Sequence, residues 1–410
     1  MQPDSWRPTR LSVAAWATYD LANTVFALGV GALFFADWLT ENDTPDLALA
    51  IAIDAAMVVV IVLGPWIGAR SDHFGKRVPY LFPATLLAVI PTFFLASVDV
   101  GPSLVLFSVA LVGFNLGSVI YDALLPDVST PENRGFVSGL GVGVGYMGSF
   151  IAVGVGAVLL DSQGYTGVFK AIAILFLLFA LPTFLVVQER PRGRRKGPAP
   201  AVLQSLSGLV DSWQSARRYD DVARFLVGRF LYTDAVNTLI GGFLTIFVKE
   251  ELDFTTEEVE VFLLISIVGA MAGAFFAGRL VDIIGPRRVL LVTLNTWILS
   301  IVIGILAVVL DVRSVIWVLS VTGGLALGST WTADRTFMAR ISPPERLGEF
   351  YGLYATVGRF ATVLGPLSWG LVVTVMGLPR TVAMGVLVLF LIASRVVLAP
   401  VSDRRRSFGQ

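Results

Sequence analysis

The chain has 410 residues, of which 55% are hydrophobic and 15% are charged, and its 30 basic and 30 acidic side chains give a formal net charge of zero. Because a soluble domain carries about 25% charged residues, this composition excludes an ordinary soluble protein, and the balanced charge gives no indication of a nucleic-acid partner. The chain has no cysteine, which excludes disulfides, thiolate metal sites and cysteine nucleophiles.

Apolar runs long enough to cross a bilayer, about 20 residues each, recur along the whole chain. The opening residues, "MQPDSWRPTR", lack the architecture of a cleavable signal, and the first apolar run is too long for a signal peptide, so we expect it to remain as a span. The predicted spans are residues 14–39, 47–69, 78–98, 103–125, 136–160, 167–187, 223–248, 259–278, 289–310, 314–338, 350–373 and 381–400. The sequence therefore predicts an all-α, multi-pass membrane protein with about twelve transmembrane helices.

One long polar stretch separates the sixth predicted span from the seventh. It runs from "QERPRGRRKGPAP" to "SARRYDDVA", and its proline, glycine and clustered arginine residues are typical of a linker. We therefore predict an N-terminal six-helix bundle over residues 1–188, a linker over residues 189–222 and a C-terminal six-helix bundle over residues 223–410.

Basic residues gather in alternate loops between the predicted spans. One side of the membrane receives the linker cluster, the run at 404–406 and Arg7, Arg10, Arg70, Lys76, Arg77, Arg134, Arg287, Arg288, Arg340 and Arg346. The other side receives few basic residues and the acidic loops "ENDTPD" and "KEELDFTTEE". By the positive-inside rule, both termini and the linker are expected to be cytoplasmic, with the spans in the plasma (inner) membrane.

Three sequence blocks occur twice, in the same order in each half. "GARSDHFGKR" (68–77) and "GRLVDIIGPRR" (278–288) share the pattern G-x-x-x-D-x-x-G-x-R, and "PENRGFVSGL" (131–140) matches "PERLGEFYGL" (344–353). "YDLANTVF" and "YTDAVNTL" share the pattern D-x-x-N-T. Such internal duplication is typical of secondary transporters whose two halves rock around a site at the membrane midplane.

The pattern G-x-x-x-D-x-x-G-x-R after the second span, with its copy after the eighth, resembles the cytoplasmic-loop motif of the major facilitator superfamily. "AWATYDLANTVFALGVGALFF", "YDALLPDVSTPENRGFVSGLGVGVGYMGS" and "ISPPERLGEFYGLYATVGRFATVLGPL" are similar to the "unknown major facilitator" group, which includes the autophagy-related fungal vacuolar amino-acid effluxer. The resemblance covers nearly the whole chain. It implies two pseudo-symmetric six-helix bundles, alternating access, and a central cavity lined by spans 1, 2, 4, 5, 7, 8, 10 and 11.

Charged residues inside predicted spans are costly, at about 2.5–3.5 kcal/mol each on insertion scales, and therefore mark functional candidates. Lys170 and Arg395 sit near the ends of spans 6 and 12, whereas the charges in the span interiors are Asp20, Asp54, Asp122, Arg229, Asp234, Asp334, Arg335 and Arg359. All of these interior charges fall on spans that the resemblance assigns to the cavity.

Two of these carboxylates each share a helix face with an amide, because three residues of helix turn about 300°. The pairs are Asp20 with Asn23 and Asp234 with Asn237. One hypothesis is that both pairs flank the cavity, where the aspartate takes up a proton or cation and the amide holds polar substrate atoms; Asp54 is the reserve candidate for this role. The alternative is structural, with each aspartate capping a helix break or bonding a neighbouring helix.

Arg359 is the candidate for contact with an anionic substrate group. Its frame "GLYATVGR" parallels "GLGVGVGY", which places Arg359 opposite Tyr146 in the repeat. It lies about nine residues, or roughly 13 Å, into its span, and a guanidinium fork suits a carboxylate or phosphate. The alternative is an ion pair within the protein, with Asp234 or Asp54 as partner, and Arg229 is expected to be a structural partner.

A second set of residues lies at the ends of spans and in the loops predicted to be cytoplasmic. By resemblance the loop residues among them form salt bridges that hold the outward-facing state and must break for the protein to open inward. Asp122 and Arg335, which are equivalent under the repeat, are expected to have a structural or gating role. The set is Asp72, Arg77, Asp122, Glu132, Asp282, Arg288, Arg335 and Glu345. The alternative is that the basic loops only set the orientation of the chain.

The only histidine, His73, stands where the resembled motif usually has arginine or lysine. We expect a solvated loop side chain; the alternative is that it tunes the salt bridges with pH. No metal cluster, nucleophile triad or ATP-binding motif is visible in the sequence, so no cofactor and no enzymatic activity are predicted.

The sequence thus predicts a secondary active transporter, a symporter or antiporter, of a small polar solute, with an amino acid or similar zwitterion favoured and proton or cation coupling as a hypothesis. The expected partners are this solute and the lipid bilayer, and a monomer is expected. A lipid or drug exporter of the same fold is one alternative, although the buried charges argue against it. The alternative from another class is a non-transporting membrane sensor, for which the linker is too short to supply an output domain.

Overall fold

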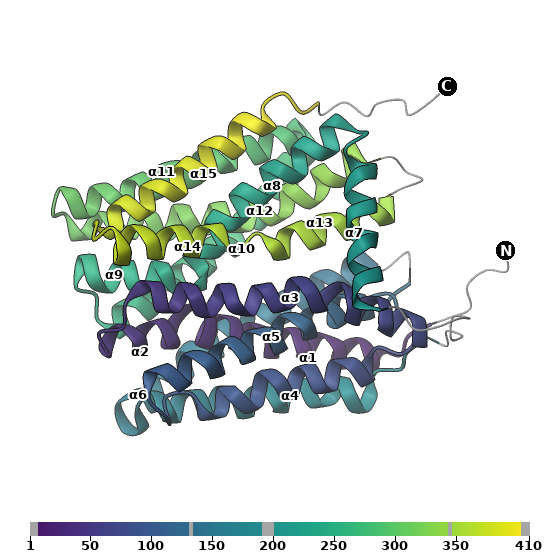
Figure 1. The fold of residues 1–410 in the computed structure, drawn as a ribbon, viewed down its shortest axis with the longest axis horizontal. Helices are drawn as coiled ribbons and strands as arrows, with labels where there is room; N and C mark the ends of the chain where they lie inside the picture. The colour runs from purple at the N-terminus through teal and green to yellow at the C-terminus, as the bar shows by residue number, and fades with distance from the viewer. Residues whose placement is uncertain (1–6, 131–133, 191–200, 343–346, 403–410) are drawn as a thin grey trace. The chain divides into compact units, whose positions relative to one another are not determined.

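The computed structural model describes residues 7–130, 134–190, 201–342 and 347–402, which form helices joined by short loops, with no strand among them (Figure 1). The chain divides into two compact units. Unit 1 consists of Met1–Thr44 and Ala55–Leu206, and unit 2 of Pro45–Asp54 and Ser207–Gln410.

Unit 1 holds the helices of the first half of the sequence. The first span is α1 (Arg10–Phe26), the π-helical η1 (Ala27–Phe34) and α2 (Phe35–Glu41). The others are α3 (Asp46–Phe74), whose first turns belong to unit 2, α4 (Val78–Phe94), α5 (Val100–Leu124) and α6 (Arg134–Val186). Gly164 has φ 63° and ψ −172°, so α6 is in fact two helices that meet at this residue.

Unit 2 holds the helices of the second half, and α7 (Val202–Ala216) lies in the segment where unit 1 gives way to unit 2. The first span of unit 2 consists of α8 (Asp220–Thr238), the π-helical η2 (Leu239–Phe243) and α9 (Leu244–Leu252). It continues with α10 (Thr256–Ile284), α11 (Pro286–Val309), the short η3 (Arg313–Val315), α12 (Ile316–Ile341), α13 (Leu347–Phe360), α14 (Leu364–Gly370), η5 (Leu371–Val375) and α15 (Arg380–Leu398).

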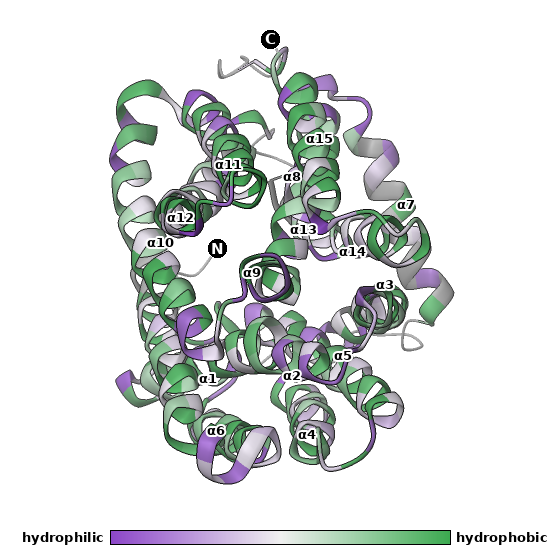
Figure 2. Cartoon of the chain, turned by 90° about the vertical axis from the view of Figure 1, so that its left-hand side faces the viewer, coloured by the Kyte–Doolittle hydropathy of each residue, from purple (hydrophilic) through white to green (hydrophobic). Residues whose placement is uncertain are grey.

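The predicted spans are confirmed as helices. Ten helical stretches of the described residues are long and apolar enough to cross a membrane, one of them the stretch of α6 that contains the bend at Gly164. The 17-residue α4 is apolar but shorter. Counted with α4, and with α6 as two helices, these stretches match the predicted spans one by one. Figure 2, which views most of the helices end-on, shows hydrophobic residues on each of them.

Small residues let neighbouring helices of each unit approach closely. In unit 1 a Cβ at Gly113 of α5 would collide with the backbone of α4 at Ala88. In unit 2 a Cβ at Gly273 of α10 would collide with Leu325 of α12, and one at Gly328 with Ala270. Van der Waals contact between backbones is a main source of helix association in lipid, which explains part of the high glycine content of the spans.

The eleventh predicted span is interrupted in the structure. It was expected to run without a break over residues 350–373, but α13 ends at Phe360 and α14 begins at Leu364. Pro366 explains the interruption, because its ring lacks an N–H and collides with the carbonyl four residues earlier, that of Thr362. We call residues 361–363 the span 11 break.

Candidate functional site

The D-x-x-N-T motif of unit 1 lies on α1 and faces α6. A Cβ at Gly145 would lie 3.0 Å from Asp20 Oδ2, so the glycine leaves room for the carboxylate. The charge of Asp20 interacts with Asp122 on α5 and with the phenol of Tyr146 on α6. The structure therefore brings together three residues that the sequence singled out separately.

Asn23 lies one turn further along α1 and is buried. Its Oδ1 atom has no hydrogen-bond partner among the described residues. A buried amide oxygen without a partner is costly, so this atom has an unused capacity to accept a hydrogen bond.

The motif of unit 2 lies on α8 and faces the span 11 break. Asn237 donates from Nδ2 to the carbonyl oxygen of Ala361 at 2.8 Å and lies 3.5 Å from Thr362 Oγ1. A carbonyl that has lost its helical partner at the break is thus satisfied by the amide. A hydrogen bond from Asn237 to a break in a neighbouring helix is the kind of contact expected if the motif has a structural role.

Asp234 is fully buried, with 0% of its surface exposed. Neither carboxylate oxygen makes a hydrogen bond of ordinary geometry with a described residue. The donors that act on it are the backbone N–H groups of Val363, Leu364 and Gly365, which follow the break.

The two motifs share one local feature and differ in another. A π-helical segment follows each of them, η1 after α1 and η2 after α8, and π-helical turns are rare and concentrate at functional sites. However, α6 passes Asp20 as an uninterrupted helix as far as Gly164, whereas the helix that passes Asp234 is broken. The repeat is therefore symmetric in sequence but not in backbone.

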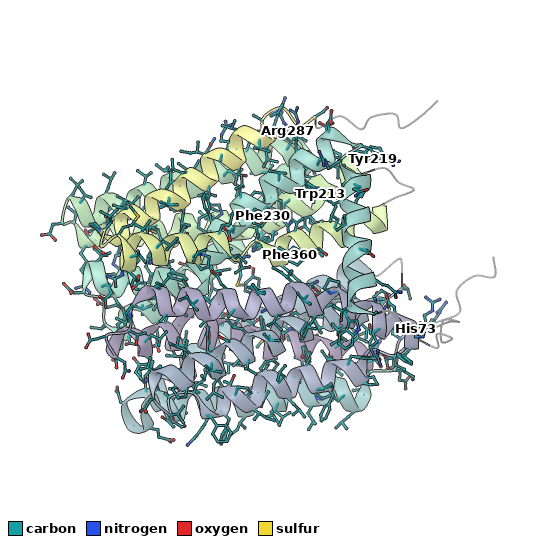
Figure 3. All side chains as sticks on the ribbon, viewed as in Figure 1. His73, Trp213, Tyr219, Phe230, Arg287 and Phe360 are labelled. Atoms are coloured by element: carbon teal, nitrogen blue, oxygen red, sulfur yellow. The ribbon has the colours of Figure 1, made fainter. Side chains whose placement is uncertain are left out.

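The remaining candidates for substrate or ion contact are Asp54 and Arg359. Asp54 is the last residue of the α3 segment that belongs to unit 2, its Oδ1 is buried without a partner, and its charge interacts with that of Asp234. Arg359 lies in the last turn of α13, partly exposed, and its carbonyl accepts a hydrogen bond from Thr362 Oγ1 at 3.2 Å. Figure 3 labels its neighbour Phe360, the last residue before the break.

Arg229 is the structural residue that the sequence predicted, and its partner is Asp334. The guanidinium on α8 makes a buried ion pair with the Asp334 carboxylate on α12. Asp334 also accepts hydrogen bonds from Tyr232 at 3.0 Å and Tyr354 at 2.9 Å, and the Tyr354 ring lies 3.6 Å from the guanidinium carbon. The sequence gave no indication of the two tyrosines, because only the packing of α8, α12 and α13 brings them to the ion pair.

Unit 1 replaces this ion pair with an aromatic stack. Since Asp122 and Arg335 are equivalent, Tyr121 stands where unit 2 has Asp334. Its ring stacks on Trp16 with centroids 4.7 Å apart, and Trp16 Nε1 donates to the Tyr121 carbonyl at 3.4 Å. The buried charge pair is therefore specific to unit 2.

The salt-bridge motif of unit 1 forms a connected network. Arg77 contacts Asp72 at 3.0 Å and Asp127 at 2.9 Å, and Asp127 also accepts from the backbone N–H of Arg190 at 3.1 Å. Glu189 accepts from the backbone N–H groups of Arg77 and Val78 at the start of α4. Sequence reasoning missed Asp127, whose only signal was its place shortly after the fourth span.

The corresponding residues of unit 2 are arranged differently. Asp282 and Arg288 are exposed, as is Arg335 on α12. Counted along the motif, the residue that matches Arg77 is Arg287 rather than Arg288, and Arg287 (Figure 3) donates to the carbonyl of Ala399 just after α15. The predicted residues Glu132 and Glu345 lie outside the described residues.

His73 is not the solvated loop residue that we expected. It lies in the last turn of α3 (Figure 3), is 4% exposed and packs edge-on against Phe74 with ring centroids 5.0 Å apart. Its Nε2 atom has no hydrogen-bond partner among the described residues. The helix continues past the predicted end of the span, so His73 lies in a helix rather than in a loop.

A further ion-pair network in unit 2 centres on Asp46 at the start of α3. Its carboxylate accepts from Trp369 Nε1 at 2.7 Å and from Arg380 at 2.9 and 3.0 Å. Arg380 also lies 3.5 Å from Glu250 and 3.8 Å from Glu251. The sequence placed these residues in loops and at span ends, and did not predict their contact.

No group of three or more metal-ligating side chains occurs in the part of the chain that the structure describes. The titratable groups buried in the membrane-length helices are carboxylates, tyrosines and arginines, with His73 at the end of α3. Such groups exchange protons and hold polar solutes, which is the chemistry available at the site.

Comparisons with known proteins agree with this architecture. The chain is 25% identical to an uncharacterized MFS-type transporter, YxiO, of Bacillus subtilis, over 95% of this chain and 94% of that protein. It is 26% identical to autophagy-related protein 22 of Kluyveromyces lactis, over 77% of this chain and 70% of that protein.

Solved structures show the same fold. A nucleoside transporter, NupG, has a TM-score of 0.72 at 12% identity and covers 95% of this chain and 98% of its own. A bacterial homolog of the human lysosomal transporter Spinster has a TM-score of 0.70 at 16% identity and covers 95% of each chain.

The family model described as the Major Facilitator Superfamily matches residues 20–366 and, a second time, residues 225–408. The first match alone spans most of both units. The chain therefore belongs to the Major Facilitator Superfamily and is a secondary transporter, not an enzyme.

Proposed function

We propose that this transporter moves a small zwitterionic solute, an amino acid or a close relative, by alternating access. The observation that carries the proposal is the repeated placement of a buried carboxylate and an amide in the first span of each unit, Asp20 with Asn23 and Asp234 with Asn237. Carboxylates inside spans face pathways rather than lipid. The resemblance to the vacuolar amino-acid effluxer group supports the same class of solute.

The two signs of charge near the motifs favour a zwitterion over a simple anion or cation. Asp54 and Asp234 carry negative charge in unit 2, and Arg359 lies at the end of α13 next to the span 11 break. A planar guanidinium binds a carboxylate through two parallel hydrogen bonds. The proposed contact is therefore between Arg359 and the solute carboxylate, with a carboxylate of the protein opposite the ammonium group.

Proton coupling is the second part of the proposal. Asp20 and Asp234 are the coupling candidates, and Asp54 is the third. A carboxylate can be charged or neutral, so each of these three can take up a proton on one side of the membrane and release it on the other when the protein changes state.

A lipid or drug exporter of the same fold is the competing function. Such a protein needs a mainly apolar path, because burying a polar group without a partner is costly. Asn23, Asp54 and Asp234 all present buried oxygen atoms without partners among the described residues. These atoms favour a polar solute.

The test is a thermal-stability shift of the detergent-purified protein against amino acids, sugars, nucleosides, organic acids and lipids. A ligand that binds only the folded state stabilises it by about 2.7 kcal/mol at 100 times its Kd. We expect a shift with an amino acid that is lost in Arg359→Ala and kept in Arg395→Ala. Arg395 is the matched control because its guanidinium bonds Asn295 at an exposed position.

Silence across the amino acids, together with a shift from lipids or hydrophobic cations, would contradict the proposal and favour the exporter. Loss of the amino-acid shift in Arg395→Ala as well as in Arg359→Ala would show that Arg359 has no special role in binding.

A further inference from the structure

Asp234 is deeply buried in unit 2. The side chain is 0% exposed, and neither oxygen makes a hydrogen bond of ordinary geometry with a described residue. An ionised carboxylate in such a place loses the hydration of water without gaining a full set of donors. Its charge state is therefore tied closely to the position of the few donors around it.

Those donors all belong to one short segment, the backbone immediately after the span 11 break. The N–H groups of Val363, Leu364 and Gly365 act on the carboxylate. They are available because Thr362 and Pro366 interrupt the helix there. A backbone N–H that has lost its helical partner seeks an acceptor, and Asp234 is the acceptor that faces these groups.

Two further side chains on the same part of α8, Asn237 and Thr238, contact the residues around the span 11 break. Asn237 donates to the Ala361 carbonyl at 2.8 Å. Thr238 packs so closely on Gly365 that a Cβ at the glycine would collide with its hydroxyl oxygen. Asn237 and Thr238 thus contact residues in the break and after it, so a change at Asp234 acts on a segment that its neighbours on α8 already hold.

The other charged and titratable groups in this region lie on α3, on the earlier part of α8, on α12 and on α13. Asp54 on α3 interacts with it by charge. Arg229 and Tyr232 lie earlier on α8 and are engaged with Asp334 of α12. Arg359 precedes the break on α13. Asp54 is thus the group that opposes a negative charge on Asp234.

We propose that Asp234 is a proton-binding group that controls the span 11 break: when ionised it holds the N–H groups of residues 363–365, and when protonated it releases them. Hydrogen bonds from neutral donors to a charged acceptor are about twice as strong as those to a neutral one. Protonation therefore loosens the junction between α13 and α14, while Pro366 keeps the helix from closing. This inference rests on the proposed proton coupling and names the element that the proton moves.

The chain supplies its own control. Asp20 occupies the equivalent position in unit 1, but α6 passes it without a break. A change in the charge of Asp20 has no freed N–H groups to act on in that helix. Only the carboxylate of unit 2 is expected to alter the helix that faces it.

The experiment uses the absence of cysteine, which allows two spin labels at chosen sites of the full-length protein. We would label Gly352→Cys, which has open space around it, and Leu371→Cys, which is exposed, so that the labels lie on opposite sides of the break. The distance distribution is measured at an acidic and an alkaline pH. We expect it to broaden or shift at acidic pH in the labelled parent and in the Asp20→Asn variant.

In Asp234→Asn we expect the acidic distribution at both pH values, because the amide cannot ionise. A parent distribution that does not depend on pH, or a pH response that persists in Asp234→Asn, would overturn the proposal. The measurement involves no solute and no transport. The labelled protein can therefore respond to pH even if transport does not depend on the proton gradient. That result would reject the proposed proton coupling but not the control of the span 11 break by Asp234.

Discussion

At the scale of single residues, Arg229 shows how a membrane-spanning helix can contain a charged side chain: its partners satisfy the guanidinium. Its guanidinium contacts Asp334, the Tyr232 hydroxyl, the Tyr354 carbonyl and the Tyr354 ring. A buried ion pair adds little to stability by itself, but removing one partner leaves an uncompensated charge. Asp234 is the opposite case, a buried carboxylate without such a set of partners.

The ion pair gives a prediction for stability. Asp334→Ala should destabilise the protein by about 3–5 kcal/mol, because Arg229 is left buried and unpaired. The double variant Arg229→Met, Asp334→Leu should be less destabilised than the single variant, since no charge remains. The midpoint of thermal unfolding in detergent measures both, with exposed Asp282→Ala as the control. Equal loss in the single variant and in the control would show that the pair is unimportant.

The two partners of Arg77 give a second prediction, because they differ in burial. Asp127 is 0% exposed and is held by two donors, whereas the Asp72 side chain is 45% exposed. Asp127→Ala should cost about 3–5 kcal/mol, and Asp72→Ala about 0–1 kcal/mol. Thermal unfolding of the two variants side by side checks this order. The reverse order would mean that the exposed pair, not the buried one, stabilises the start of α4.

At the scale of elements, the contact between α8 and the span 11 break depends on small side chains. Gly365 of α14 leaves no room for a Cβ beside the Thr238 hydroxyl, and Asn237 bonds the freed carbonyl of Ala361. Two of the π-helical segments, η1 and η2, follow the motifs directly. Irregular backbone inside a membrane is tolerated only where protein groups or water satisfy it, and here the side chains of α8 do so.

This contact predicts coupling between two substitutions. Gly365→Ala should destabilise the protein by about 1–3 kcal/mol through overpacking. Adding Thr238→Ala removes the obstructing hydroxyl, so the double variant should lose less than the sum of the single losses. Gly385→Ala is the control, since nothing lies within 4 Å of a Cβ there. Strict additivity in the double variant would rule out the predicted contact.

At the scale of the whole molecule, hydropathy was enough to predict the spans, because length and apolar composition are local properties. The pairing of Arg229 with a carboxylate was only partly predictable, since Asp334 was visible as a charge but not as its partner. The burial of Asp127 and His73 and the contact of Asp46 with Arg380 could not be predicted, because tertiary packing decides them. Pro366 was the available signal for the span 11 break.

The duplication of the chain explains what could and what could not be predicted about Asp20 and Asp234. It identified Asp20 and Asp234 as equivalent, and both lie in the first helix of their unit, before a π-helical segment. It also implied equal surroundings, which the structure does not show, because only α13 and α14 are separated by a break. Equivalent residues of a repeat therefore need separate functional tests.

The most direct test of the account is proton movement during solute transport in proteoliposomes that contain a pH-sensitive dye. With an amino acid that stabilises the protein, we expect solute addition to move protons in the parent and in Asp282→Asn, and no proton movement when Asp20→Asn and Asp234→Asn are combined. Amino-acid transport with proton movement unchanged in that double variant would contradict the role of these carboxylates. Transport of lipids or hydrophobic cations, with no response to any amino acid, would contradict the proposed solute.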